Sequence, residues 1–164
     1  TGGASGTGGS TGAAGGDPCP EAHISIDFLG GDPPPPGDDL AYGCPNGWGS
    51  NETSHAVAYD GYVGPGPNSQ HELFMRGCDA NGSHEIDVQV PLFAPGSSAT
   101  DAFTYTLPGT TEQTDHGVTV TVTSYGPSDG YIEGSYTGHV QVANITQPVQ
   151  GQFKLCHVAS FLPP

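Results

Sequence analysis

The chain has 164 residues, and two Lys/Arg against 17 Asp/Glu give it a formal net charge of −15. Two basic residues are too few to neutralise a phosphate backbone, which argues against nucleic-acid binding. No apolar run approaches the ~20 residues of a membrane-spanning helix. Many of the 27 glycines lie near the N-terminus, so the remainder is long enough for one domain with a modest core.

The N-terminal segment, residues 1–16, contains only Gly, Ser, Thr and Ala. Such a segment cannot bury apolar surface, so we expect a flexible tether. It resembles the tether that follows the lipidated cysteine of bacterial surface lipoproteins, which would place a lipid anchor upstream of Thr1. An ordinary linker after a secretion signal is the alternative.

Residues 17–164 are expected to form a single domain that opens with a loop-rich entry over residues 17–49. Residues 21–29 alternate apolar and polar side chains, as a half-buried strand does. Four prolines at 33–36 then favour a polyproline II spacer. Further along, the pattern predicts strands at 54–59, 71–77, 84–92, 103–105, 116–125, 131–142 and 149–158.

Turn and glycine signals punctuate these strands. Asn81-Gly82, between strands 71–77 and 84–92, is among the strongest hairpin signals. Gly134 and Gly138 lie inside strand 131–142, where they indicate a bulge, a bend or close packing. No segment shows a helical period over ten or more residues. About eight short strands at this spacing predict an antiparallel β-sandwich, jelly-roll-like or Ig-like, with an open barrel as the alternative.

A family resemblance covers about residues 70–156. After the Asn-Gly hairpin come the phrases VPLFAPG, FTYTLPG, VTVTSYG, YIEGSYTGHV and QPVQGQFKL. This order is similar to that of small β-sandwich surface lipoproteins of environmental bacteria, whose function is uncharacterised. The resemblance implies the fold and a location outside the cell or on its outer surface, and no catalytic or ligand residues.

The chain has four cysteines, Cys19, Cys44, Cys78 and Cys156. None forms a CxxC pair, which argues against a zinc knuckle or a thioredoxin-like site. An even number in an acidic chain that looks secreted predicts two disulfides. Three pairings are open, and we favour Cys19–Cys44 with Cys78–Cys156.

No cofactor is expected, and calcium is the ion that the sequence leaves open. Asp38-Asp39 follows the proline run, and Asp79-x-Asn81 resembles the start of a calcium loop without its distal Glu. The dipeptides His71-Glu72 and His84-Glu85 would converge on a divalent cation if the two histidines were cross-strand neighbours. All these residues also suit ordinary turns and strand ends.

The sequence predicts no catalytic residues and a protein that is not an enzyme. It has no GxSxG motif and no phosphate-binding glycine loop before a helix. A surface-displayed sandwich that binds a carbohydrate, a cation or another surface protein fits best, with Tyr59, Tyr62, Trp48 and Tyr125 as aromatic candidates. The alternative is a self-assembling subunit of an extracellular filament or coat, whose N-terminal tail a neighbouring subunit would order along a sheet edge.

Overall fold

The computed structural model describes residues 19–30, 37–44, 55–63, 70–107, 113–114, 117–142 and 145–158. The tail 1–16, the proline run 33–36 and Trp48 lie outside these residues. The described part contains strands and no helix, and therefore no helix that could span a membrane. The strands are β1 (His23–Phe28), β2 (Asp38–Leu40), β3 (Val57–Val63), β4 (Gln70–Cys78), β5 (Glu85–Val90), β6 (Gly96–Ala99), β7 (Ala102–Thr106), β8 (Gln113–Thr114), β9 (Thr119–Tyr125), β10 (Tyr131–Val142) and β11 (Ile145–Val158).

The strands are hydrogen-bonded into one mostly antiparallel sheet with the order β6-β9-β10-β11-β3-β4-β5-β7-β8. β11 also pairs with β1, which in turn pairs with β2. The end of β11 turns to pair with β3, and this pairing is parallel, with Cys156 opposite Val57. The all-β, mostly antiparallel prediction is confirmed. The hydrogen-bonded strands form a single continuous sheet, because β11 serves as a partner to three other strands.

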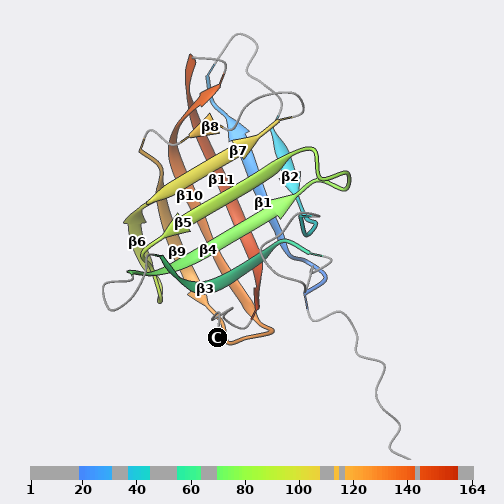
Figure 1. Ribbon diagram of the computed structural model, residues 1–164, viewed down its shortest axis with the longest axis vertical. Coiled ribbons are helices and arrows are strands. Elements are labelled where there is room, and N and C mark those ends of the chain that lie inside the picture. The colour runs from blue at the N-terminus through green and yellow to red at the C-terminus, as the bar shows by residue number, and fades with distance from the viewer. Residues whose placement is uncertain are drawn as a thin grey trace, which may run out of the picture.

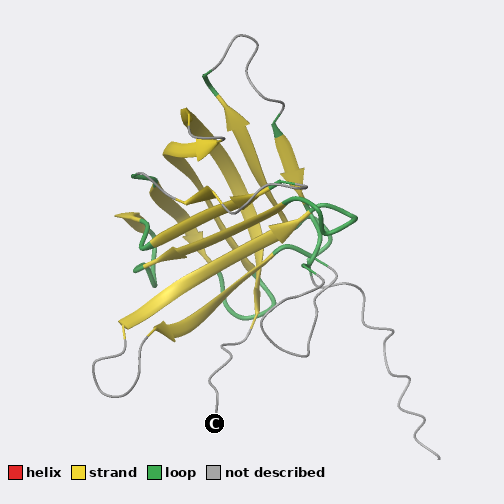
Figure 2. Ribbon diagram, turned by 45° about the horizontal axis from the view of Figure 1, so that its top comes forward, coloured by secondary structure: helices red, strands yellow, loops and turns green. Residues whose placement is uncertain are grey.

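Two groups of strands cross each other in space. Figure 1 shows β3, β4, β5 and β7, here called the front strands, running diagonally across β1, β9, β10 and β11, here called the back strands. The tilted view of Figure 2 shows the same crossing. The largest cluster of buried apolar side chains draws on both groups, for example Leu73 and Phe103 from the front and Val120 and Phe153 from the back. The core therefore lies between the front and back strands.

The alternation read from the sequence places side chains on the correct faces. Ile24, Ile26 and Phe28 of β1 are buried, whereas Asp27 between them is exposed. β4 likewise buries Leu73 and Met75. The sequence did not predict the three short strands β2, β6 and β8. A strand of two to four residues is too short to show a hydrophobic alternation, and it forms because of the strand with which it pairs.

The two glycines inside β10 sit where the backbone leaves no room for a side chain. The register between β9 and β10 shifts between Glu133 and Gly134, which is a β-bulge. A Cβ on Gly134 would lie 2.6 Å from Phe153 Cζ, and one on Gly138 would lie 2.5 Å from Val118 Cα. Of the three predicted alternatives, a bulge occurs at Gly134 and close packing at both glycines.

Two disulfides join Cys19 to Cys156 and Cys44 to Cys78, with Cα–Cα distances of 5.5 and 5.2 Å. Two bridges were predicted, but the favoured pairing, Cys19–Cys44 with Cys78–Cys156, is wrong. β1 runs antiparallel to β11, with His23 opposite Lys154, so the chain just before β1 passes Cys156. The backbone before Cys44 bridges directly to Cys78. Strand pairing therefore sets the connectivity, and the two bridges are typical of an oxidising compartment.

Candidate functional site

The first of the acidic residues predicted to bind calcium is engaged by other side chains. Asp38 opens β2, and its Oδ2 accepts a hydrogen bond of 2.6 Å from the buried Tyr105 hydroxyl. The same oxygen pairs with His84 Nδ1. Burial first, and then the Asp38 carboxylate, raise the pKa of Tyr105 far above its ordinary range. Asp38 therefore has protein partners that tie β2 to β7 and to the residue just before β5.

Asp79 stabilises the turn of the β4–β5 hairpin. Its Oδ1 accepts hydrogen bonds from the backbone N–H groups of Ser83 and His84, at 2.6 and 3.1 Å, and its Oδ2 accepts one of 2.7 Å from the Ser83 hydroxyl. Burial alone would raise the pKa of this carboxyl, but these hydrogen bonds outweigh it and hold the pKa below its ordinary value. This is the capping role that Asp commonly plays in turns. Asn81 is exposed at the same turn.

The structure does not gather these residues into a metal-ligand group. Asp39 is exposed on β2. Within the described ranges, the one cluster of three His, Cys, Asp or Glu ligand atoms is Cys44, Cys78 and Glu85, and its two cysteines are bonded to each other. His71 and His84 lie at opposite ends of the β4–β5 hairpin, because Leu73 pairs with Val90 and Cys78 with Glu85. The two histidines are thus not cross-strand neighbours.

The predicted aromatic candidates have separate surroundings. The Tyr125 hydroxyl donates to Asp60 Oδ1, so this ring has a structural role. Tyr62 stacks on His71, which in turn stacks on Phe93, with centroid distances of 4.7 and 4.1 Å. Tyr62 is 56 % exposed and Phe93 45 %. Tyr59 lies on the outer face of the front strands, in the groove described next.

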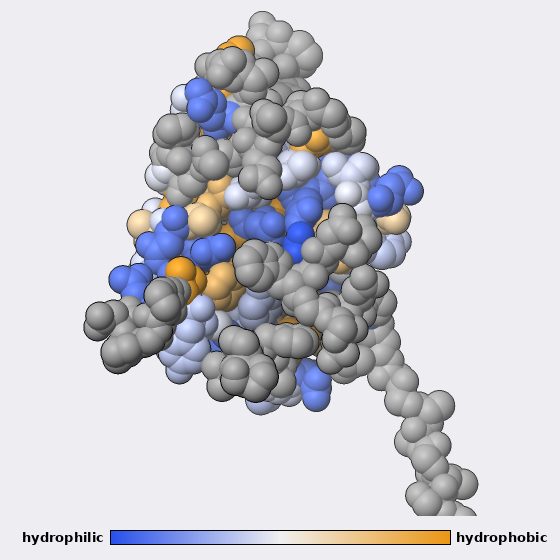
Figure 3. Space-filling view, viewed as in Figure 1, coloured by the Kyte–Doolittle hydropathy of each residue, from blue (hydrophilic) through white to orange (hydrophobic). Residues whose placement is uncertain are grey.

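The outer face of the front strands carries a groove of about 340 Å³, here called the front groove. Because side chains alternate between the two faces of a strand, every second residue of the front strands points outward toward this groove. Figure 3 shows hydrophilic and apolar residues side by side on this face. The side chains that line the groove are Tyr59, Phe74, Arg76, Glu85, Asp87, Gln89, Thr104 and Thr106, together with parts of Met75 and Val88.

One half of the front groove is aromatic. Tyr59 and Phe74 are cross-strand partners, and their rings stack at 5.1 Å with an interplanar angle of 5°. A Cβ on Gly61 would lie 2.6 Å from the Phe74 ring, so the glycine allows that ring to lie flat across β3. Burial, and then the nearby Asp87 carboxylate, raise the pKa of Tyr59. The Tyr59 hydroxyl therefore stays neutral and available as a hydrogen-bond donor.

The other half of the front groove is charged. Arg76 Nη2 pairs with Glu85, and Arg76 Nε lies 3.2 Å from Asp87 Oδ1 in an ion pair that lacks hydrogen-bond alignment. Arg76 Nη1 is buried and has no hydrogen-bond partner. The register places Gln89 beside Phe74 and Thr104 beside Asp87. Donors and acceptors thus line the groove next to the aromatic pair.

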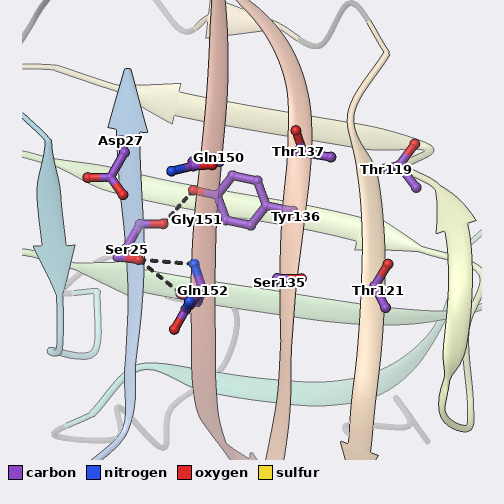
Figure 4. A pocket seen from close by; sticks show the side chains of 10 residues that line it. All are labelled: Ser25, Asp27, Thr119, Thr121, Ser135, Tyr136, Thr137, Gln150, Gly151 and Gln152. Atoms are coloured by element: carbon purple, nitrogen blue, oxygen red, sulfur yellow. Dashed lines mark hydrogen bonds between the residues drawn. The ribbon is translucent and has the colours of Figure 1, made fainter. Parts of the chain in front are cut away.

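A second pocket, of about 450 Å³, lies on the outer face of the back strands and is here called the back pocket. Figure 4 shows its lining of short hydroxyl and amide side chains, with Asp27 at one side. The Tyr136 hydroxyl donates a 2.6 Å hydrogen bond to the Ser25 carbonyl, and Ser25 Oγ accepts one of 3.0 Å from the Gln152 N–H. The back pocket lacks an exposed aromatic ring among its lining residues. It is a polar depression whose groups hold β1 to β11.

Glu72 is a buried acid next to the front groove. It alternates with Phe74 and Arg76 on the outer face of β4 but is only 2 % exposed. Its Oε2 is buried and has no hydrogen-bond partner. Burial first, and then the nearby Asp101 carboxyl, raise the pKa of Glu72. The fold therefore favours the uncharged form of this side chain.

This raised pKa predicts a pH dependence of stability. A carboxyl whose pKa is raised by folding contributes stability below its ordinary pKa, and the contribution is lost as pH rises through the folded value. Between about pH 4 and pH 8 in EDTA, the wild type should lose free energy of unfolding relative to Glu72→Gln, by about 1.4 kcal/mol per unit of pKa shift. Urea unfolding across this range measures it. Asp129→Asn, at an exposed turn, is the control, and a Glu72→Gln curve parallel to the wild type would contradict the prediction.

Sequence reasoning missed the front groove, although part of its signal was present. In the predicted strand 71–77, a period of two residues puts Phe74 and Arg76 on the face opposite Leu73 and Met75. This pattern contained no sign that β3, β5 and β7 would add their own outward side chains beside them. Comparison of the chain with protein-family models, with curated proteins and with solved structures finds no match.

Proposed function

We propose that this protein is a non-enzymatic, secreted or surface-tethered β-sandwich protein that binds a neutral glycan along the front groove. The observation that carries the proposal is the stacked Tyr59–Phe74 pair beside Arg76, Asp87 and Gln89 in one outward-facing groove. Binding sites generally combine apolar and aromatic lining with a few placed polar groups.

The two halves of the front groove match the two kinds of surface on a sugar ring. The C–H face of a pyranose is apolar and packs against aromatic rings such as Tyr59 and Phe74. Its hydroxyl groups both donate and accept hydrogen bonds. Arg76 supplies donors only, Asp87 acceptors only, and the Gln89 amide supplies both.

Charge favours a neutral glycan over an acidic one. The front groove holds one cation, Arg76, against the carboxylates of Glu85 and Asp87. The whole chain carries a formal charge of −15, so its field repels uronate or sulfated sugars, most strongly at low salt. A neutral ligand meets no such barrier.

The proposed location outside the cell or on its outer surface rests on three features. The two disulfides favour an oxidising compartment. The Gly/Ser/Thr/Ala segment 1–16 resembles a lipoprotein tether. The deficit of Lys and Arg suits a protein that contacts neither nucleic acid nor an anionic membrane surface.

Binding of neutral oligosaccharides by isothermal titration tests the proposal, with uronate oligosaccharides of equal length as the charged comparison. Gln89→Ala should weaken binding of a neutral ligand about tenfold, or about 1.4 kcal/mol, and Tyr59→Ala should weaken it more. Gln152→Ala in the back pocket is the matched control and should bind as the wild type does. Equal losses in Gln89→Ala and Gln152→Ala, or no affinity for any neutral glycan tested, would overturn the proposal.

The second candidate is the self-assembling subunit of an extracellular filament or coat, and the exposed aromatic row Tyr62–His71–Phe93 favours it. Aromatic side chains are enriched at protein–protein contacts, and two of these rings are about half exposed. Light scattering and electron microscopy of the full chain test this function. A polymer in the wild type that Tyr62→Ser with Phe93→Ser abolishes would support it, and a monomer at all concentrations would exclude it.

A further inference from the structure

The buried acid Glu72 lies near a second acid, Asp101, and neither of the chain's two Lys/Arg side chains, both of which the structure describes, is paired with these acids. Asp101 lies just before β7, and its backbone N–H donates to the Gln89 carbonyl. Gln89 pairs with Phe74 on the other side, so Asp101 is held across β5 from the Glu72 end of β4. The Asp101 carboxyl lies close enough to Glu72 to raise the pKa of that buried side chain.

Arg76 and Lys154, the two Lys/Arg residues of the chain, are engaged elsewhere. The chain has two Lys/Arg residues: Arg76 pairs with Glu85 and Asp87, and Lys154 pairs with Glu21. His71, next to Glu72 in sequence, is stacked between two aromatic rings. A buried carboxylate without a partner is costly, and such groups in proteins are normally paired or bound to a metal ion.

We propose that Glu72 and Asp101 bind a divalent cation, with Ca²⁺ as the ion that fits carboxylate oxygens best. Two observations support the site: Glu72 Oε2 is buried without any hydrogen-bond partner, and the backbone hydrogen bond from Asp101 to Gln89 holds a second carboxyl near Glu72. A cation of charge +2 balances the two carboxylates and supplies the partner that Oε2 lacks. The acidic field of the chain raises the local cation concentration.

This site differs from the calcium sites expected from the sequence. Asp38 and Asp79 already accept hydrogen bonds from side chains and backbone N–H groups, whereas Glu72 Oε2 has no hydrogen-bond partner. The inference does not rest on glycan binding, because Glu72 and Asp101 are not among the residues that line the front groove.

The test distinguishes two ways in which the negative charge of Glu72 and Asp101 could be neutralised: by a bound Ca²⁺ ion or by a proton. After EDTA treatment, thermal unfolding at pH 7 is followed with 1 mM CaCl₂ and with NaCl of equal ionic strength, and Ca²⁺ binding is titrated by calorimetry. Calcium should raise Tm at least about 5 °C more than NaCl does, as expected for a ligand well above its Kd. Asp101→Asn and Glu72→Gln should each abolish this excess, whereas Asp39→Asn, an exposed acid outside the pair, should keep it.

Each outcome decides between the two explanations. Equal shifts with calcium and NaCl, together with a stability that changes only with pH, would mean that a shared proton neutralises the pair and would overturn the proposal. Calcium binding that survives in Asp101→Asn would also overturn it. If Glu72→Gln fails to fold, the variant Asp101→Asn, at an exposed position, and direct calorimetry still decide. Glycan affinity in EDTA should be unchanged in Asp101→Asn, so failure of one function is distinguishable from failure of the other.

Discussion

Replacing Cys19 and Cys156 together by alanine is expected to lower the free energy of unfolding by about 5 kcal/mol. This bridge joins residues separated by 137 positions, so it removes more conformational freedom from the unfolded chain than any shorter loop would. Such a loss is of the order of the whole stability of a small domain. Urea unfolding of the oxidised proteins, monitored by tryptophan and tyrosine fluorescence, measures the difference.

The second bridge supplies the internal comparison. Cys44–Cys78 joins residues separated by 34 positions, so Cys44→Ala with Cys78→Ala should cost about 4 kcal/mol, less than the first pair. Each variant retains the other bridge. A larger loss from the shorter loop would show that the disulfides act mainly through the native state, and would contradict the loop-closure argument.

Gly151→Ala is expected to destabilise the fold by about 3 kcal/mol or more, because a Cβ at this position overlaps atoms that cannot move independently. The added carbon would lie 2.5 Å from Tyr136 Cζ and closer still to the Ser25 carbonyl oxygen. Tyr136 is 2 % exposed, and its hydroxyl donates to that same Ser25 carbonyl. Relieving the overlap therefore requires β1 and β10 to move away from β11.

Gly96→Ala is the matched control for this substitution. Its Cβ would lie 3.6 Å from the nearest atom, a Leu92 methyl carbon, which is ordinary van der Waals contact. We expect no loss of stability there, and a small gain from the stiffer unfolded chain. Thermal unfolding of both variants measures the contrast. Equal effects of the two substitutions would mean that the crowding at Gly151 does not limit the fold.

The alternation of β1, β4 and β5 was readable because each strand faces the core on one side and solvent on the other. The same rule placed Phe74 and Arg76 on the outer face, and so identified half of the front groove. Alternation within one strand could not predict that Tyr59 and Gln89 would lie beside these residues, because contacts between distant segments decide which strands pair. The same limitation explains the two missed cysteine pairings.

By itself, the sequence determined the strand class, the inward and outward faces, an irregular or closely packed position at Gly134 and the presence of two disulfides. These follow from local side-chain periodicity, from backbone sterics and from composition, which are properties of short segments. Only the tertiary structure decided that β11 would pair with β1, β3 and β10, that Cys19 would meet Cys156, and that Glu72 would be buried near Asp101. Each of these contacts joins residues far apart in the chain, and its geometry depends on how all the strands pack together.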